Sequence, residues 1–143
     1  RSKRLKETLD KAGIRWRVIV ISACYSGSFV PALQDDNTLI ITASAADRAS
    51  FGCSNEADYT YFGRAFFDQA MREQTSVSAA FEQAKATVAQ WESAQGFEAS
   101  EPQWSIGKNM EFMLPQLEQR LFPVVSKTDS KAVETPQLSV QTQ

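Results

Sequence analysis

The chain has 143 residues, 43% of them hydrophobic and 22% charged, and its formal net charge is −2. This length corresponds to one domain, or part of one, that is large enough to bury a core. The net charge argues against a general nucleic-acid-binding protein, and no stretch approaches the ~20 apolar residues that span a bilayer. A membrane or export segment upstream of Arg1 is left open, so the compartment is not predicted.

The first predicted element is a helix over the first twelve residues. Leu5, Leu9 and Ala12 recur at helical spacing, and Gly13 is a suitable helix stop. Residues 1–17 carry seven of the fifteen basic side chains and two acidic ones. We interpret them as a solvated helix face rather than as a surface for an anionic partner. Because the chain opens inside a helical pattern and without a methionine, we expect it to be a fragment of a longer polypeptide.

The next element is a strand at residues 14–22, and it leads to the most informative residue of the chain. Positions 18–21 are all apolar, which is typical of a strand that is covered on both faces. Cys24 follows in a loop of small residues, at the carboxyl end of the strand, where open α/β sheets carry their chemistry. A thiol is largely protonated at neutral pH and needs a base, yet the chain contains no histidine. Either the base lies outside this sequence or Cys24 is not catalytic.

The remaining elements predict an α/β fold. A second buried strand at 38–43 precedes a long polar loop at 44–60, which leaves the same sheet edge as Cys24 if the two strands are parallel. Helices are predicted over 61–72, over 76–95 with a stop at Gly96, and over 110–121, where Pro115 should interrupt or restart the helix. A short strand is predicted at 103–107. This alternation favours a three-layer α/β sandwich with a mainly parallel sheet.

Three cysteine-loop chemistries can be compared on the residues. A thiol phosphatase loop needs an arginine six positions after the cysteine, where this chain has Val30. A hydrolase nucleophile elbow needs a histidine later in the chain, and none follows. Cys24 and Cys53 make neither a disulfide framework nor a metal site, and we interpret Cys53 as a small buried thiol.

The third possibility rests on three sequence blocks: residues 22–28 around Cys24, residues 42–53, and residues 59–63. Together they resemble the legumain family of caspase-like cysteine peptidases, most closely its bacterial branch, over about residues 14–107. The resemblance implies that residues 1–121 are the C-terminal portion of a caspase-like catalytic domain, an incomplete sandwich that lacks its N-terminal strands. Residues 122–143 read as a disordered tail.

The resemblance also implies site residues. In this family the histidine precedes the cysteine on a neighbouring strand, so it is expected upstream of Arg1. Cys24 would be the nucleophile, and its backbone N–H would supply part of the oxyanion hole. The backbone of Ser50, Phe51 and Gly52 would lie along an extended substrate.

Two positions depart from the family pattern. Legumains read asparagine or aspartate partly through two acidic residues, and here those positions hold Tyr25 and Arg64. Asparaginyl specificity is therefore not expected. Arg64 would favour an acidic residue at the cleaved position if it enters the pocket, and otherwise it is a solvent-facing helix arginine. Tyr25 and Ser50 fit a pocket wall as well as they fit packing or capping.

Three functions are compatible with these residues. The first is a cysteine endopeptidase with a Cys–His dyad, which acts on peptide or protein substrates, needs no cofactor or metal, and is inactive as this chain alone. The second is a catalytically silent caspase-like binding or scaffold module, and the third is a small-molecule-binding α/β domain. The expected partners are the substrate and the upstream part of the same protein. Self-association is also expected, through the sheet edge that the upstream strand would otherwise cover.

Overall fold

The computed structural model describes residues 2–51 and 60–121, and these form an α/β fold around a three-stranded sheet. The strands are β1 (Arg17–Ile21), β2 (Thr38–Thr42) and β3 (Gln103–Ile106). The sheet order is β1-β2-β3, with β1 parallel and β3 antiparallel to β2. All three predicted strands are present, but the sheet is mixed, where a mainly parallel one was expected.

The direction of β3 follows from where the chain enters it. The backbone N–H of Ala45, just after β2, donates to the carbonyl of Ser100, just before β3 (2.9 Å). The chain therefore approaches β3 at the end where β2 stops, and it must run back along β2. This places Ile41 opposite Trp104 in the antiparallel pair.

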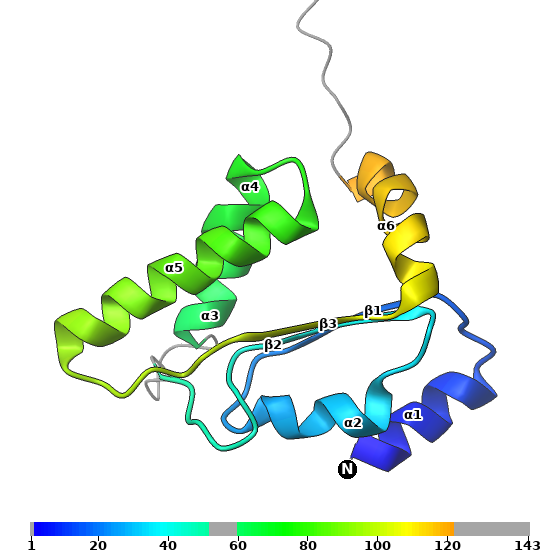
Figure 1. Ribbon diagram of the computed structural model, residues 1–143, viewed down its shortest axis with the longest axis horizontal. Helices are drawn as coiled ribbons and strands as arrows, with labels where there is room; N and C mark the ends of the chain where they lie inside the picture. Colours follow the sequence, from blue (N-terminus) through cyan, green and yellow to red (C-terminus); the bar gives the residue numbers. More distant parts are fainter. Residues whose placement is uncertain (1, 52–59, 122–143) are drawn as a thin grey trace, which may run out of the picture.

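Helices lie on both sides of the sheet (Figure 1). One side carries α1 (Ser2–Lys11) and the pair η1 (Ser26–Phe29) and α2 (Val30–Leu33). The other side carries α3 (Tyr61–Gly63), the π-helical stretch η2 (Arg64–Ala70), α4 (Met71–Glu73), α5 (Val77–Gln95) and α6 (Lys108–Leu121). This arrangement is compatible with part of a caspase-like fold.

The two central helical predictions are confirmed, and the caps explain their bounds. The segment α3–η2–α4 begins where the Thr60 hydroxyl accepts from the Gly63 N–H. Helix α5 begins with Ser76 as N-cap and ends at Gly96, whose φ of 69° is the left-handed conformation that glycine adopts without strain. Both segments bury an apolar face in the core, which contains Leu39, Ile41, Phe62, Phe66, Phe81, Ala84, Val88, Met110 and Leu114.

Helix α6 runs on through Pro115, where we predicted an interruption. Proline cannot donate to the carbonyl four residues earlier, which belongs to Glu111. Glu111 and Pro115 are both exposed, so water can satisfy that carbonyl, while Leu114 is buried in the core. The buried face holds the helix together across the missing bond.

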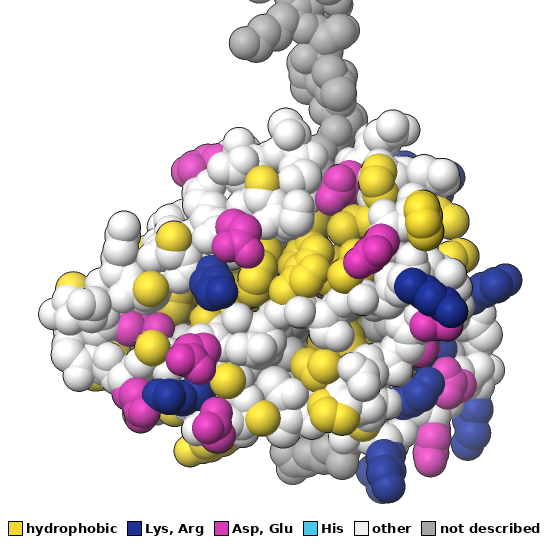
Figure 2. Space-filling view, viewed as in Figure 1, with side chains coloured by type: hydrophobic (Ala, Val, Ile, Leu, Met, Phe, Trp, Pro, Cys, Tyr) yellow, Lys and Arg dark blue, Asp and Glu magenta, His cyan; other side chains and the backbone are white. Residues whose placement is uncertain are grey.

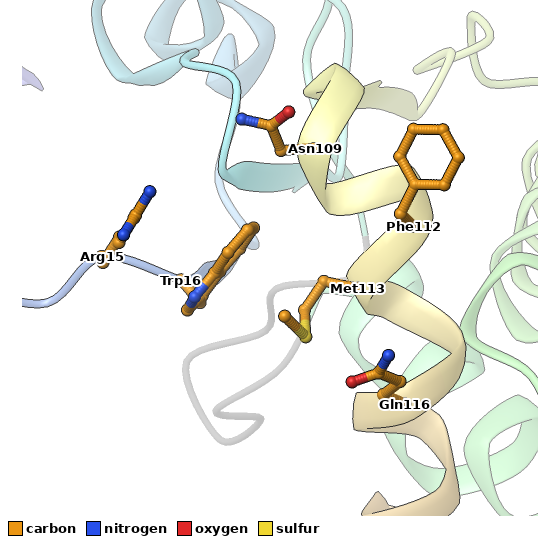
Figure 3. Close-up of a pocket in the computed structure, with 6 residues that line it drawn as sticks. All are labelled: Arg15, Trp16, Asn109, Phe112, Met113 and Gln116. Carbon is orange, nitrogen blue, oxygen red and sulfur yellow. The ribbon is translucent and has the colours of Figure 1, made fainter.

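Strand β1 differs from the strand covered on both faces that its apolar sequence predicted. All five residues of β2 are buried, whereas Val18 of β1 is 41% exposed. Among the described residues, β1 pairs only with β2 and is therefore an edge strand. An open pocket of about 390 Å³ lies beside its start, where Met113 of α6 points toward Trp16 and Phe112 points away (Figure 3).

Ion pairs hold the basic N-terminal segment in place, among them Lys6 with Asp35 (3.9 Å), which precedes β2. Arg17 is buried and donates to the Asp10 carboxylate (2.7 Å). This hydrogen bond, helped by the charge of Lys6, holds the pKa of Asp10 below its usual value. The Lys and Arg side chains over α1 otherwise face solvent (Figure 2), as the predicted solvated face requires.

Helix α6 ends at Leu121, and the predicted tail at 122–143 lies outside the described residues. No helix in the described ranges is long and apolar enough to cross a membrane.

Candidate active site at the carboxyl ends of β1 and β2

Cys24 is an exposed thiol three residues beyond the end of β1. Ser22, Ala23 and Tyr25 beside it are exposed as well, whereas Ser26 and Gly27 are buried. The chain thus places the sulfur at the rim of the sheet and turns inward directly afterwards. This is the location that the sequence predicted.

The parallel pairing of β1 and β2 brings the loop after each strand to the same rim, as predicted. Two buried serines join the loops: the Ser26 N–H donates to the Ser44 hydroxyl (3.1 Å), and the Ser44 N–H donates to the Ser26 hydroxyl (3.2 Å). The Ser44 hydroxyl also donates to the carbonyl of Ala23 (3.2 Å). The backbone on both sides of Cys24 is therefore held by the neighbouring loop.

Gly27 is required by this close approach. A Cβ at position 27 would lie 2.6 Å from the backbone nitrogen of Ala46 and 2.8 Å from the carbonyl oxygen of Ser44. Since real Cβ contacts are longer, a side chain here would push the two loops apart. The small residues after Cys24 thus allow the loops to pack, in addition to leaving the thiol uncovered.

Cys24 itself contacts Ser50. Its Sγ lies 3.2 Å from the Ser50 carbonyl oxygen, to which the thiol donates, and 3.3 Å from the Ser50 nitrogen, whose N–H donates to the sulfur. Both contacts are made by backbone atoms of Ser50, which is buried. The structure therefore brings together two of the residues that the sequence singled out, 26 positions apart.

Tyr25 adopts a strained conformation next to the thiol. Its φ of 56° and ψ of 21° lie in the left-handed region, which costs a non-glycine residue roughly 1 kcal/mol or more. Its N–H donates to the carbonyl of Arg48 (2.8 Å), while its side chain is 55% exposed. The left-handed conformation turns the chain directly after Cys24, and it leaves the ring of Tyr25 exposed.

Phe51 continues the loop away from Cys24 into an aromatic cluster. Its ring stacks on Phe97 at 4.6 Å between centroids, and its carbonyl accepts from the Tyr61 N–H (2.7 Å). Tyr61 in turn meets Trp91 edge to face at 5.5 Å. The cluster forms a wall that connects the Ser50 region to the start of α3 and to the end of α5.

Arg64 lies beside two members of that cluster, Tyr61 and Trp91. It is exposed, and with Tyr61, Trp91, Ala94 and Gln95 it lines a pocket of about 230 Å³. Tyr61, whose N–H donates to the Phe51 carbonyl, lines this pocket, whereas Cys24 does not. Gly52 and Cys53 lie outside the described residues.

The polar surroundings of the rim hold both charge signs but no metal-binding cluster within residues 2–51 and 60–121. The Arg48 guanidinium pairs with the Glu98 carboxylate and lies 3.9 Å from a carboxylate oxygen of Glu101. Sequence reasoning missed this pair and the Ser26–Ser44 pair, because each joins residues far apart in the chain. The one visible signal was the run of small polar residues in both loops.

The rim thus carries the features of a thiol enzyme of the α/β class: an exposed cysteine at the end of a parallel strand, with backbone groups fixed around it. A family profile described as the Peptidase C13 family matches residues 1–114. The chain belongs to this family of cysteine peptidases, the legumain family that the sequence blocks resemble. No curated protein and no solved structure matches the chain.

Proposed function

We propose that the protein is a cysteine endopeptidase in which Cys24 is the nucleophile. Membership of the Peptidase C13 family supports cysteine peptidase chemistry in general, and the exposed thiol held against the Ser50 backbone is the observation that carries the assignment to Cys24. The thiolate attacks the peptide carbonyl carbon and a C–S bond forms. The C–N bond then breaks, and the amine leaves with a proton from the catalytic acid. Water hydrolyses the thioester to the carboxylic acid and regenerates the thiol.

The acid and base of this mechanism is a histidine on a segment that precedes Arg1 in the longer protein. The edge position of β1 among the described strands supports this, because a further strand paired there in the parallel direction would end at the same rim as Cys24. The backbone N–H of Cys24 would bind the oxyanion, which is where negative charge develops in the transition state. This chain alone, which lacks histidine, is expected to be inactive.

The substrate would bind in an extended conformation along Ser50, Phe51 and Gly52. In the structure, the Ser50 backbone groups are engaged by sulfur, which is a weak donor and a weak acceptor. A peptide that offers amide groups to Ser50 replaces weak contacts with stronger ones, and it frees the thiol for attack. Tyr25, whose ring is exposed beside the thiol, would form part of the pocket wall.

Arg64 would select the residue at the cleaved position. Its pocket adjoins Tyr61, which is bonded to the Phe51 carbonyl, so a side chain that leaves the substrate near Phe51 can reach it. A guanidinium at an aromatic-walled pocket favours a carboxylate. We therefore propose cleavage after acidic residues.

The test uses the longer protein that includes the upstream segment. Iodoacetamide should alkylate Cys24 much faster than Cys53, and Cys24→Ser should abolish peptide cleavage while Cys53→Ser preserves it. Equal labelling of the two thiols in the folded protein contradicts the nucleophile assignment.

A silent caspase-like scaffold is the second candidate, and the absence of histidine from this chain is the observation that favours it. The two candidates differ in the sequence upstream of Arg1. A buried strand that ends in His-Gly supports the peptidase, and an upstream sequence without histidine supports the scaffold.

A further inference from the structure

Helix α5 carries a buried carboxylate in its last turn. Glu92 is 2% exposed, and one neighbour satisfies it: the Ser100 N–H donates to both carboxylate oxygens (3.1 and 3.2 Å), and the Ser100 hydroxyl donates to one of them (3.0 Å). Ser100 is itself buried. Within residues 2–51 and 60–121, every hydrogen bond to this carboxylate comes from Ser100.

A carboxylate is an expensive choice for this position. Burial removes its hydration, and the last turn of a helix is its negative end, where an anion is disfavoured. An apolar residue would fill the same space without either cost. What the carboxylate adds is three hydrogen bonds from Ser100. Any role of Glu92 beyond packing therefore acts through Ser100 and its contacts.

Ser100 supports the loop that carries the Cys24 contacts. Its carbonyl accepts from the Ala45 N–H (2.9 Å), directly after the Ser44 that is joined to Ser26. The Ala45 carbonyl in turn accepts from the Arg48 N–H (3.2 Å).

Two connections lead from Ala45 to the Cys24 loop: one through its neighbour Ser44 to Ser26, and one through Arg48 to Tyr25. The Arg48 carbonyl accepts from the N–H of Tyr25, and the same loop ends at Ser50, whose backbone contacts the sulfur. The loop is thus bound by the Cys24 loop on one side and by Ser100 on the other.

We propose that Glu92 is a positioning residue for the Cys24–Ser50 pair and acts through Ser100 and Ala45. The carboxylate fixes Ser100, Ser100 fixes the start of the loop at residues 44–51, and that loop fixes the thiol. The proposal rests on the proposed function, since it assigns Glu92 to the support of the nucleophile. Glu92 does not contact the sulfur and takes no part in the bond-making steps.

The experiment compares Glu92→Gln with Glu82→Gln, the same substitution at an exposed position of the same helix. Glutamine keeps the shape, but its NH₂ group replaces one oxygen that accepts from Ser100. Amide hydrogen exchange is followed at Ala45 and Ser50, with the amide of Ile40 in the central strand as the reference for global stability.

We expect Glu92→Gln to speed exchange at Ala45 and Ser50 on the order of tenfold, as loss of a charged hydrogen bond predicts, with Ile40 and the Glu82→Gln protein unchanged. Unchanged exchange at Ala45 and Ser50, or an equal rise at Ile40, overturns the proposal. If Glu92→Gln does not fold, Ser100→Ala, which removes only the hydroxyl donor, is judged by the same amides. Peptide cleavage by the Cys24→Ser protein would instead refute the proposed function. The two failures can be told apart, because the hydrogen-exchange measurement does not depend on catalysis.

Discussion

The outer edge of β1 offers a sharp test of how this chain behaves alone. The Arg17 N–H donates to Asn37, and the Ile21 carbonyl accepts from Ala43, so both residues direct their backbone toward β2. Since alternate residues bond to the neighbour in a parallel pair, the backbones of Val18 and Val20 point away from it. Two N–H and two C=O groups therefore line an apolar edge that bears no charged side chain between Arg17 and Ile21.

We expect two copies of the chain to pair through this edge. Two N–H groups from each copy give four hydrogen bonds, worth about 4 kcal/mol at about 1 kcal/mol each. Burial of Val18 adds to this, while lost translational and rotational freedom opposes it. The expected dissociation constant therefore lies between about 1 μM and 1 mM.

The perturbation is Val18→Pro. Proline removes an outward N–H, is compatible with an edge strand, and leaves the bonds to β2 intact. Two of the four bonds are lost in the pair, about 2 kcal/mol or roughly a 30-fold weaker association. Ile19→Pro is the matched control, because its N–H faces β2 and its loss should unfold the sheet.

Sedimentation over a range of concentrations measures the association, and hydrogen exchange at Val18 and Val20 locates it. Their amides should be protected only when the chain is concentrated, whereas the Ile19 amide is protected throughout. A stable monomer with protected amides at Val18 and Val20 would show that the edge is already covered, and the fragment interpretation would be wrong.

The remaining predictions concern single residues. Arg64→Glu should reverse a preference for acidic residues at the cleaved position in a peptide library, and a profile indifferent to this change would leave Arg64 as a surface residue. A Cβ at Gly107 would overlap the carbonyl oxygen of Asp35, as one at Gly27 would overlap the Ser44 loop. Gly27→Ala and Gly107→Ala should therefore each destabilise the fold by about 1–3 kcal/mol in urea unfolding, but only Gly27→Ala should slow alkylation of Cys24. Because the folded-state pKa of Asp10 is lowered, its pairing with Arg17 stabilises the fold above the unfolded-state pKa and is lost as the pH falls through the folded-state pKa. Asp10→Asn should therefore flatten the loss of stability below about pH 4.

The hydrophobic pattern alone predicted helix α5, which buries one face, and strand β2, which is buried at every residue. The apolar stripe of α5 and the fully apolar β2 set their own environment, because a long apolar face has to be buried wherever the chain goes. The location of Cys24 followed as well, since a strand followed directly by small residues leaves the cysteine uncovered at the rim of the sheet. The parallel pairing of β1 and β2 brings the loop that carries Ser50 to the same rim, as expected, but the contact between Cys24 and Ser50 itself was not predicted.

The features that failed to show in the sequence depend on partners far along the chain. The exposure of β1 depends on which strand lies beside it, and the direction of β3 depends on where Ser100 meets Ala45. The apolar run at 18–21 favoured a strand covered on both faces, and the pattern of 103–107 does not specify the direction of the strand. Glu92 looked like an ordinary polar residue of α5, because nothing in its neighbourhood announces a partner eight residues later.

Several features that cost free energy lie around the Cys24 rim. Tyr25 and Glu101 are the non-glycine residues with positive φ among those described, and they lie in the Cys24 loop and in the segment that supports the loop beside it. Glu92 adds a buried carboxylate, and the loops meet closely enough to exclude a Cβ at Gly27. Away from this rim, Ser76 and Gly96 are ordinary caps, although the π-helical stretch η2 and Pro115 in α6 also depart from local rules. None of the features around the rim stabilises the fold, and departures from local rules tend to occur where a site has to be held in one geometry. Their concentration around an exposed thiol is thus what we expect if the rim is held ready to react.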